Sequence, residues 1–465
     1  MGQISKTKRI RGWIAFDFAT QPYYTLGLTF IFGPYFAAVA TSYYAGLGLD
    51  ETAADARAQS IWSLGQTIAG LFVAFTAPIL GILADRAGRK IPYIAVFSLF
   101  YFAGAWSMWF LTPDGSTLIL VLVLFYVGFI AGESMLNFVN AFLPALGEDE
   151  ETGSISGTGA SIGYVGGVIS LFIMLLFLAE NETGRTLIGL EPLFGLDPEA
   201  REGTRSVGPL IAIWFAVFMV PFFMYVRDEV GPKMAHKVGS IGSELKVLAR
   251  TVVRRRSLGA FLLSSMLYRD SLNALYAYGG VYATLVLNWS ITQIGVFGIV
   301  GAITAAVVTF LGGQADKRLG PKPVIIACIL ALITVTTVMV GMSREMFFGV
   351  ALDESSTLPD IVFYVCGAII GGAGGAIYAA SRSMMVRHTD PARPAEAFGL
   401  FALSGKATAF LAPALITLFT WWLQDPRLGF IPVIFLFLLG LLLLGWVNKN
   451  GDRAEWSAPL SPQPS

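Results

Sequence analysis

The sequence predicts an all-α membrane protein with twelve transmembrane helices, arranged as two six-helix halves related by pseudo-two-fold symmetry around a central cavity. The first observation is composition: the 465 residues are 55% hydrophobic and only 13% charged, whereas soluble domains carry about 25% charged residues. The second is a series of twelve apolar runs that are long enough for a bilayer crossing, which takes about 20 residues. The third is a long polar segment that separates the first six runs from the last six.

The expected membrane spans are, in chain order, residues 12–40, 59–84, 91–112, 117–146, 155–179, 207–226, 257–287, 291–314, 323–342, 361–386, 398–422 and 428–447. Pro22 is expected to kink the first of them, since proline disrupts a helix interior. We expect an N-terminal half over 1–227, a basic cytoplasmic linker over 228–256, a C-terminal half over 257–447 and a disordered cytoplasmic tail over 448–465. Within the linker, "SELKVLARTVV" can form a short helix on the membrane surface.

The distribution of Lys and Arg predicts the orientation, because cytoplasmic loops carry an excess of both. With the N-terminus inside, most of the basic residues fall in cytoplasmic segments. The basic residues expected outside are Arg57, Arg185, Arg201, Arg205, Arg344 and Arg427. Both termini are therefore expected in the cytoplasm, with the protein spanning a bacterial cytoplasmic membrane. The apolar run after Arg11 is too long for a cleavable signal and is expected to remain as the first helix.

The charge balance and the rare residue types argue against several other classes. The 31 Lys+Arg against 31 Asp+Glu leave no basic surface for a nucleic acid. Cys328 and Cys366 lie in apolar runs, and His236 and His388 lie in expected loops, so the sequence predicts no disulfide framework, no metal site and no cofactor. A membrane enzyme would need a nucleophile with a base and an acid, and no such set is present. A sensor would need a soluble output domain, for which only the short central loop is available.

A loop motif occurs once in each half. "GILADRAGRK" (81–90) follows the second span, and "GGQADKRLGPK" (312–322) follows the eighth. Repeats of this kind are a transporter architecture, with the substrate site between the halves. The residues expected to act in gating are Gly81, Asp85, Arg86, Gly88, Arg89, Gly312, Asp316, Lys317 and Arg318.

At the first of these loops the chain resembles the major facilitator superfamily, whose motif there reads G-x-L-A-D-R-x-G-R-K. Three longer stretches resemble its vacuole-effluxer-like branch, also called the unknown major facilitator family: "GWIAFDFATQPYYTLGLTFIFGPYF", "FLPALGEDEETGSISGTGASIGYVGGV" and "AASRSMMVRHTDPARPAEAFGLFALSGKATAFLAPAL". The branch tends to have Trp and Asn around the acidic residue of the first helix, where this chain has Phe18 and Gln21. Fungal members of the branch are regarded as amino-acid effluxers.

The resemblance implies a role for particular helices and motif residues. In this fold helices 1, 4, 7 and 10 line the central cavity, and helices 3, 6, 9 and 12 face lipid. The motif aspartate, here Asp85, caps the N-terminus of helix 11 and pairs with an arginine, which latches the outward-open state. The second copy, Asp316, is implied to act against helix 5.

Six charged residues interrupt the apolar runs: Asp17, Glu133, Arg269, Asp270, Arg382 and Lys406. A charge at the centre of a membrane helix costs roughly 2.5–3.5 kcal/mol, so such residues normally face a cavity or a partner. Alternatives stay open for three of them. Asp17 can be an interfacial acid, Arg382 can be a gate residue or a lipid-headgroup anchor, and Asp270 can neutralise Arg269 or Lys406 as a buried ion pair.

Polar residues recur at helical spacing beside these charges, so that each group shares one face of its helix. The three expected groups are Asp17 with Gln21 and Tyr24, Glu133 with Asn137 and Asn140, and Arg269 with Asn273 and Tyr276. Single polar residues of this kind also serve as hydrogen-bonding contacts between helices. Gly159, Gly163 and Gly167 have the spacing of a close helix–helix contact.

These patterns predict a proton-coupled secondary transporter working by alternating access. Acids in the N-terminal half and an excess of basic groups in the C-terminal half suit a small amphoteric solute, such as a neutral amino acid, moving outward. Glu133 is the expected proton carrier, because burial disfavours the charged form of a carboxyl group. An anionic or lipid-like metabolite bound by Arg382 and Lys406 is the alternative substrate. The expected partners are the small-molecule substrate, protons and the lipid bilayer, with the protein as a monomer.

Overall fold

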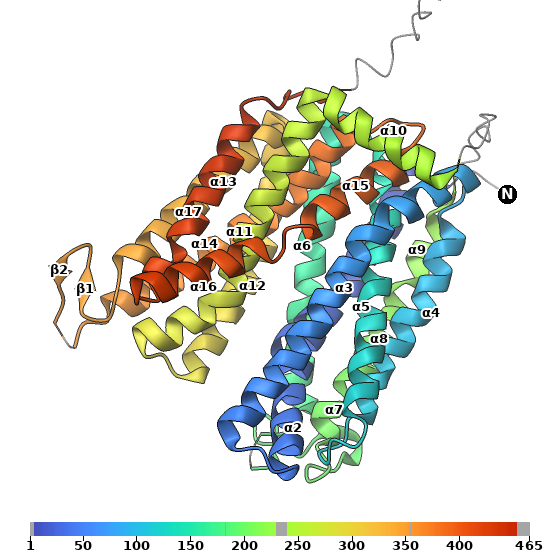
Figure 1. The fold of residues 1–465 in the computed structure, drawn as a ribbon. Helices are drawn as coiled ribbons and strands as arrows, with labels where there is room; N and C mark the ends of the chain where they lie inside the picture. The colour runs from blue at the N-terminus through green and yellow to red at the C-terminus, as the bar shows by residue number, and fades with distance from the viewer. Residues whose placement is uncertain (1–3, 182, 229–239, 354, 453–465) are drawn as a thin grey trace, which may run out of the picture. The chain divides into compact units, whose positions relative to one another are not determined.

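The computed structural model of the chain describes residues 4–181, 183–228, 240–353 and 355–452. Residues 229–239 of the expected linker, which include His236, and residues 453–465 of the expected tail lie outside the described residues. The chain forms two compact units (Figure 1). The first comprises Met1–Val73, Gly88–Val139 and Ile162–Gly231, and the second comprises Ala74–Ala87, Asn140–Ser161 and Pro232–Ser465.

The first expected span is divided into three helical segments. Helix α1 (Lys6–Pro22) ends at Pro22, the π-helix η1 (Tyr23–Phe30) follows, and α2 (Phe32–Gly46) completes the span. A proline contributes no N–H to the ladder and crowds the preceding turn, which accounts for the change of helix type at this position. Single-turn π segments inside helices are frequent at functional sites.

The other helices of the N-terminal half follow the expected runs. They are α3 (Glu51–Ala87), α4 (Ile91–Ser107) with the 3₁₀ turn η2 (Met108–Phe110), α5 (Leu118–Asn140), α6 (Asp149–Ile173) with the π turn η4 (Met174–Leu178), α7 (Glu202–Arg205), α8 (Val207–Phe218) and α9 (Val220–Tyr225). Within the first unit α1 packs on α8 and α9, and α4 packs on α8. Tyr23, Tyr101 and Phe125 form a buried aromatic core there.

The C-terminal half is helical except for one short hairpin. It contains α10 (Ile241–Arg254), α11 (Arg256–Leu287), α12 (Ile291–Leu319), α13 (Pro321–Gly341), α14 (Leu358–His388), α15 (Pro394–Lys406), α16 (Leu411–Leu423) and α17 (Ile431–Leu444). Strands β1 (Met346–Phe347) and β2 (Val350–Ala351) pair antiparallel between α13 and α14. Helix α14 packs against α12 and α13, and α17 packs against α11 and α13 (Figure 1).

The structure confirms the predicted all-α membrane fold. In the described part of the chain, ten helical stretches are long and apolar enough to cross a membrane, and Leu428–Leu444 is a shorter apolar helix. The remaining expected span, 257–287, coincides with α11, a helix of 32 residues that carries Arg269 and Asp270. The helix expected in the linker is also present as α10.

Two details differ from the sequence-based expectation. His388 was expected in a loop but is the last residue of α14, where it is buried. Its ring stacks on Phe261 and lies within hydrogen-bond distance of the Ser257 hydroxyl at 2.8 Å. The helices that carry the repeated motifs are longer than the expected spans 59–84 and 291–314, since α3 continues to Ala87 and α12 to Leu319, and the aspartate of each motif lies near the end of its helix, as expected for Asp85.

Candidate functional site

Glu133 on α5 meets Tyr24 of η1 inside the first unit. The Tyr24 hydroxyl donates a hydrogen bond to Glu133 Oε1 at 3.1 Å. Gly132 lies beside this contact and packs tightly on Tyr101, since a Cβ there would lie 3.2 Å from the Tyr101 ring. Glu133 is half-buried. The π segment of the first span thus delivers a phenol to the one carboxyl group in the interior of α5.

Asp17 and Gln21 lie on the side of α1 that faces α6. A Cβ on Gly163 would come within 3.2 Å of the Asp17 Cβ, and one on Gly167 would come within 3.0 Å of the Gln21 Cγ. Asp17 is 9% exposed. Tyr24 was expected to share a helical face with these two residues, but it lies beyond Pro22 in the π segment and turns toward α5 instead.

Arg269 reaches from α11 to the last turn of α15. Its Nη1 donates to the Phe401 carbonyl at 3.0 Å, and its guanidinium lies 4.5 Å from the centre of the Phe401 ring. A Cβ on Gly405 would overlap the guanidinium, so a larger residue there would displace the Arg269 side chain from this position. Lys406 is the final residue of α15 and is half-buried. Two cations therefore lie at the negative end of the α15 dipole, where positive charge is favoured.

Asp270 points to a different element, although it adjoins Arg269 in sequence. It is 2% exposed, and its Oδ2 accepts the backbone N–H of Ala412 at 2.9 Å. Ala412 is the second residue of α16, so Asp270 caps that helix from outside, which its dipole favours. The ion pair with Arg269 or Lys406 that we considered from the sequence is absent from the described residues, and Oδ1 of Asp270 has no hydrogen-bond partner there.

The cap occupies an interruption in the expected span 398–422, which the structure divides into α15 and α16. Pro413 explains the interruption, because it has no N–H and its ring crowds the carbonyl group four residues earlier. Residues 407–410 form turns between the two helices. This site is therefore built on a discontinuous helix, a device by which transporters expose helix ends inside the membrane.

The other polar residues of the expected groups have varied surroundings. Asn137 on α5 is half-buried, and Asn273 on α11 is exposed. Tyr276 is 50% exposed, and its hydroxyl packs so closely on α14 that a Cβ on Gly374 would overlap it. Arg269, Asn273 and Tyr276 do share one side of α11, with Asp270 turned away from it.

Arg382 is fully buried and binds α6 within the second unit. Its Nε donates to the Ser156 hydroxyl at 3.0 Å, and its Nη2 donates to the Ser156 carbonyl at 2.8 Å. Nη1 lies 3.5 Å from Asn140 Oδ1, and the guanidinium lies 4.8 Å from the centre of the Tyr378 ring. Ser156 also donates to the Ala379 carbonyl at 2.9 Å. These contacts lock α14 to the first turns of α6.

Asp85 caps α15. Its Oδ1 accepts the N–H of Ala395 at 3.2 Å, and its Oδ2 accepts the N–H of Glu396 at 2.8 Å. Pro394, the first residue of α15, has no N–H, so the carboxylate takes the first two donors that the helix offers. The resemblance implied this cap, in which the motif aspartate meets the N-terminus of helix 11.

Two glycines let the backbones of α3 and α15 touch beside this cap. A Cβ on Gly81 would lie 2.9 Å from the Cα of Glu396, and one on Gly399 would lie 2.6 Å from the Ala77 carbonyl oxygen. Contacts below 3.0 Å force the backbone apart, so these positions tolerate only glycine without rearrangement.

Arg86 connects the motif to α10. Its guanidinium pairs with Glu244, with Nη2 at 2.7 Å from Oε1 and Nε at 3.2 Å from the same oxygen. Gly88 adopts φ +60° just after α3, a conformation that favours glycine, and Arg89 is exposed.

The second copy of the motif packs without a cap. Asp316 is 1% exposed, and a Cβ on Gly153 of α6 would overlap its carboxyl group. Neither carboxyl oxygen of Asp316 has a hydrogen-bond partner among the described residues. A Cβ on Gly312 would lie 2.8 Å from that of Ala376 on α14. Lys317 and Arg318 are exposed in the last turn of α12. Asp316 thus meets the predicted helix, but one turn beyond its first residue and not at its N–H groups.

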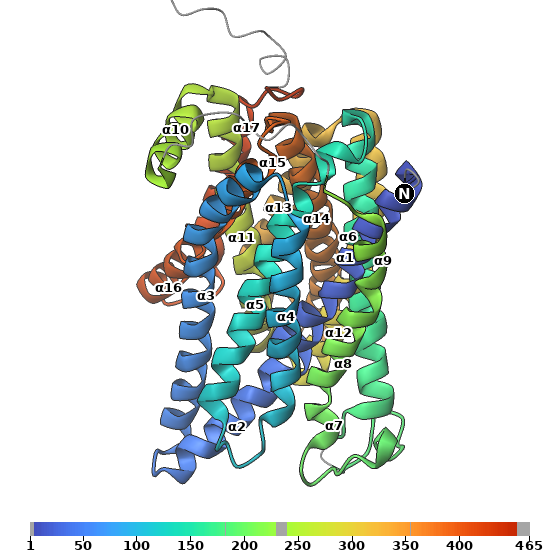
Figure 2. The same cartoon turned by 90° about the vertical axis from the view of Figure 1, so that its right-hand side faces the viewer.

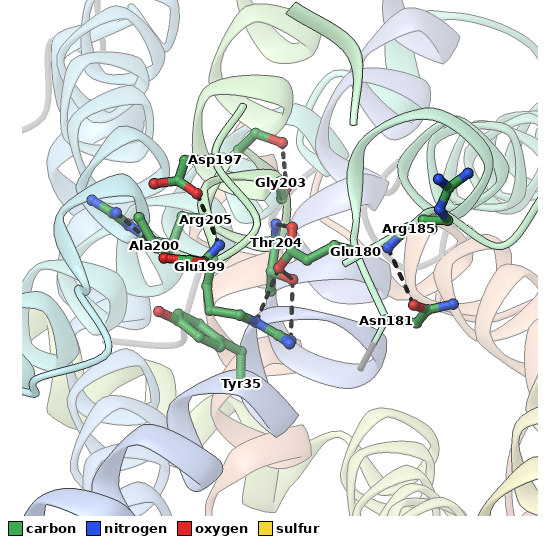
Figure 3. A network of polar contacts seen from close by, with 12 residues as sticks. Tyr35, Glu180, Asn181, Arg185, Asp197, Glu199, Ala200, Gly203, Thr204 and Arg205 are labelled. Atoms are coloured by element: carbon green, nitrogen blue, oxygen red, sulfur yellow. Dashed lines mark hydrogen bonds and ion pairs between the residues drawn. The ribbon is translucent and has the colours of Figure 1, made fainter. Parts of the chain in front are cut away.

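The loop that leads into α7, drawn as a ribbon in Figure 2, holds a buried polar network that was not anticipated from the sequence (Figure 3). The Glu180 carboxylate accepts the Thr204 N–H at 3.0 Å and the Thr204 hydroxyl at 2.6 Å, and it pairs with Arg201 Nε at 2.9 Å. Arg205 donates to the carbonyls of Trp109 and Ala200. The network ties the end of the fifth expected span to the start of the sixth.

Two of the contributing residues carried no usable signal in the sequence. Ser156 and Glu244 occupy ordinary helical positions, and their partners lie 226 and 158 residues away. Pro413 was a readable signal, since a proline inside an apolar run marks a helix break. Among the described residues no group of three or more His, Cys, Asp or Glu side chains could hold a metal ion.

Comparisons with known proteins place these features in a family. The family model described as "Vacuole effluxer Atg22 like" matches residues 147–457. An uncharacterized MFS-type transporter of Bacillus subtilis (strain 168), YxiO, is 25% identical over 451 residues, covering 96% of each chain. Autophagy-related protein 22-1 of Neosartorya fischeri is 24% identical over 327 residues, covering 67% of this chain and 51% of the relative. The chain thus spans about half the length of that fungal relative.

Solved structures share the fold at low sequence identity. The proton:xylose symporter XylE, of the major facilitator superfamily (MFS), superposes with a TM-score of 0.69 at 12% identity, covering 97% of this chain and 98% of that one. The human organic anion transporter MFSD10 superposes with a TM-score of 0.67 at 13% identity, covering 95% of this chain and all of that one. These matches support the twelve-helix architecture of two halves.

Proposed function

From the membership of this chain in the vacuole effluxer Atg22-like family of MFS transporters, we propose that it exports small amphoteric solutes, such as neutral amino acids, in exchange for protons. The chain is an integral multi-pass membrane protein of a transporter family. The substrate, the coupling ion and the direction are the proposed parts. The Lys and Arg distribution favours cytoplasmic termini in a bacterial inner membrane.

The hydrogen bond between Tyr24 and Glu133 is the observation that carries proton coupling. Glu133 is a carboxyl group inside an apolar helix, and its partner belongs to a π segment that departs from regular helix geometry. A phenol can donate to a carboxylate and can also accept from a carboxylic acid, so the pair accommodates either protonation state. An acid that changes protonation during the cycle needs such a partner.

The two cations at the end of α15 support recognition of a substrate carboxylate. Arg269 presents five N–H donors in a planar fork, a geometry that matches a carboxylate with two parallel hydrogen bonds. Lys406 adds a second positive charge at the same helix end. The acids of the first unit, Asp17 and Glu133, supply groups for an ammonium. This division of charge favours a solute that carries both signs.

The contacts of Asp85, Arg86 and Arg382 support a gate at the ends of α3, α6 and α15. Each of the three residues joins helices that are far apart in the sequence, through hydrogen bonds or an ion pair. Such contacts can break and form again when the helices separate and return. In the alternating-access mechanism that we propose, these contacts close one side of the transporter and separate when that side opens.

Counterflow in proteoliposomes tests the proposal. Vesicles preloaded with a mixture of unlabelled amino acids are given labelled leucine or tyrosine, with and without a pH gradient. We expect saturable entry that accelerates with the gradient. Glu133→Gln should keep exchange but lose the response to the gradient, and Arg269→Ala should lose both. Glu191→Gln is the matched control, because Glu191 is exposed in the loop between η4 and α7.

Two results would contradict the proposal. Retention of the full gradient response by Glu133→Gln would remove Glu133 as the proton carrier. Absence of amino-acid counterflow from folded protein, together with entry of an organic anion that depends on Arg269, would favour the anionic substrate over the amphoteric one.

A further inference from the structure

Asp316 has an unusual environment for a carboxyl group in this chain. It is 1% exposed, and within the described part of the chain neither of its oxygens receives a hydrogen bond. The counterpart in the first motif, Asp85, receives two backbone N–H groups. The two copies of one motif therefore give their aspartates different surroundings: Asp85 accepts two backbone N–H groups, and Asp316 accepts none from the described residues.

Close contact between the backbones of α6 and α12 seals Asp316 from water. A Cβ on Gly157 would lie 2.5 Å from the Cα of Gly313, and one on Gly313 would lie 2.8 Å from the Cα of Gly157. Gln314 reinforces the contact by donating to the Ser154 hydroxyl at 3.1 Å. The residue of α6 that meets Asp316 is Gly153, which has no side chain that could donate a hydrogen bond.

The charged and polar groups around Asp316 do not neutralise it. From α14, the Ser383 hydroxyl and the Arg387 guanidinium face the carboxyl group, and Ser383 Oγ also lacks a hydrogen-bond partner. Arg387 donates to the Lys449 carbonyl at 3.0 Å. On α12 itself, Lys317 and Arg318 are exposed to solvent. From α6, Asp149 begins the helix one turn before Gly153 and adds negative charge. Arg382 is committed to Ser156.

An ionised carboxylate is costly in such a place, because its desolvation amounts to several kcal/mol and the facing Ser383 hydroxyl and Arg387 guanidinium offset only part of that cost. A neutral carboxylic acid avoids that cost and can donate to the facing Ser383 hydroxyl, which would satisfy both groups. When α6 and α12 separate, water can solvate the carboxylate and the proton can leave.

We propose that Asp316 is a proton-binding residue of the gate, protonated while α6, α12 and α14 pack as they do here and released to water when they separate. Closing this contact then takes up one proton, and opening releases it. The contact is favoured as the pH falls and weakened as the pH rises. The inference adds a second titrating residue to the proposed proton coupling, at a place distant in sequence from Glu133.

Thiol accessibility measures the contact directly. Thr309 lies on α12 at the contact with α6, is fully buried, and its hydroxyl has no hydrogen-bond partner, so Thr309→Cys introduces a probe at little cost. The experiment uses Cys328→Ala/Cys366→Ala protein in proteoliposomes and a membrane-permeant maleimide. Labelling of Val253→Cys, which is 82% exposed on α10, corrects for the intrinsic effect of pH on thiol reactivity.

We expect the corrected labelling rate at position 309 to rise several-fold as the pH increases through the titration of Asp316. With Asp316→Asn, whose side chain is always neutral, the rate should stay low and independent of pH. With Asp85→Asn the pH dependence should persist, because Asp85 has donors that favour its charged form. Gly153→Ala, which pushes into the carboxyl group, should give fast labelling at every pH.

Infrared difference spectra supply a second readout that needs neither substrate nor transport. The carbonyl band of a protonated carboxylic acid should be present in the wild type and in Asp85→Asn at neutral pH and should lose intensity in Asp316→Asn. An unchanged band in Asp316→Asn, or an unchanged pH dependence of labelling, would overturn the proposal. Slower maleimide labelling of position 309 when sodium is added at constant pH would also overturn it, because a cation other than the proton would then close the contact. Failure of the Glu133 proposal changes none of these readouts.

Discussion

Asp85 and Glu396 are 311 residues apart in sequence, yet the carboxylate of the first accepts the backbone N–H of the second at 2.8 Å. The contact joins the last turns of α3 to the first turn of α15. It is specific in geometry, because the preceding Pro394 leaves the N–H groups of Ala395 and Glu396 as the first available donors. A capping interaction of this kind is worth about 1 kcal/mol, and the glycine contacts beside it set how closely the helices approach.

Gly81→Ala should separate α3 from α15 and lower thermal stability. A Cβ at this position meets the backbone of Ala395 and Glu396, neither of which can give way cheaply. Gly70→Ala on the same helix is the matched control, since its Cβ would meet nothing within 4 Å. Alanine normally gains about 0.5–1 kcal/mol over glycine inside a helix, so the control should melt at the same or a higher temperature. Equal melting temperatures for the two variants would refute the close contact at Gly81.

Asp270→Ala should loosen the first turn of α16. The change leaves the buried N–H of Ala412 without an acceptor, at a cost of about 1–3 kcal/mol. Hydrogen–deuterium exchange at Ala412 and its neighbours should accelerate, while exchange in α17 stays unchanged. Asp425→Ala is the control, because Asp425 follows α16 and pairs with Arg427 instead. Unaltered exchange at Ala412 in the Asp270 variant would show that the cap does not form.

Arg86 and Glu244 should show a measurable coupling energy. Each side chain is 21% exposed, and the pair has two short contacts. We expect a double-mutant cycle with Arg86→Ala and Glu244→Ala to give about 0.2–1 kcal/mol, the range of partly exposed pairs. A cycle with Arg89→Ala in place of Arg86→Ala, again with Glu244→Ala, should give a coupling energy near zero, because Arg89 is exposed. If both cycles gave the same value, the ion pair would contribute nothing specific.

Glu180→Ala should destabilise the loop before α7. Glu180 is 5% exposed and accepts two hydrogen bonds from Thr204 in addition to its pair with Arg201. Hydrogen bonds to charged groups are worth about 1.5–3 kcal/mol, so we expect a lower melting temperature and faster tryptic cleavage after Arg201. Glu191→Ala in the same loop should leave both unchanged. Resistance of Arg201 to trypsin in the Glu180 variant would argue against this network.

The sequence predicted the elements of this fold well because membrane spans are set by length and apolarity, which are local properties. The resemblance to a superfamily motif also implied that Asp85 meets the start of α15 and that Asp316 meets α6. It could not predict which way Asp270 turns, since the choice between Arg269, Lys406 and the end of α16 depends on a helix break that only Pro413 announced. Nor could it predict the environment of Asp316, because a missing donor is a property of Gly153 and of the close approach of two backbones.

The interruption at residues 407–410 gives the eleventh span two separate attachments. The part before the break, α15, receives hydrogen bonds from Asp85 of α3 and from Arg269 of α11, whereas the part after it, α16, gives a backbone N–H to Asp270 and packs on α17. Force applied to α15 by movement of α3 is therefore not transmitted rigidly to α16, as it would be along a continuous helix. The two parts of the span can therefore move separately, and the turns at residues 407–410 determine how much of a movement of α15 reaches α16.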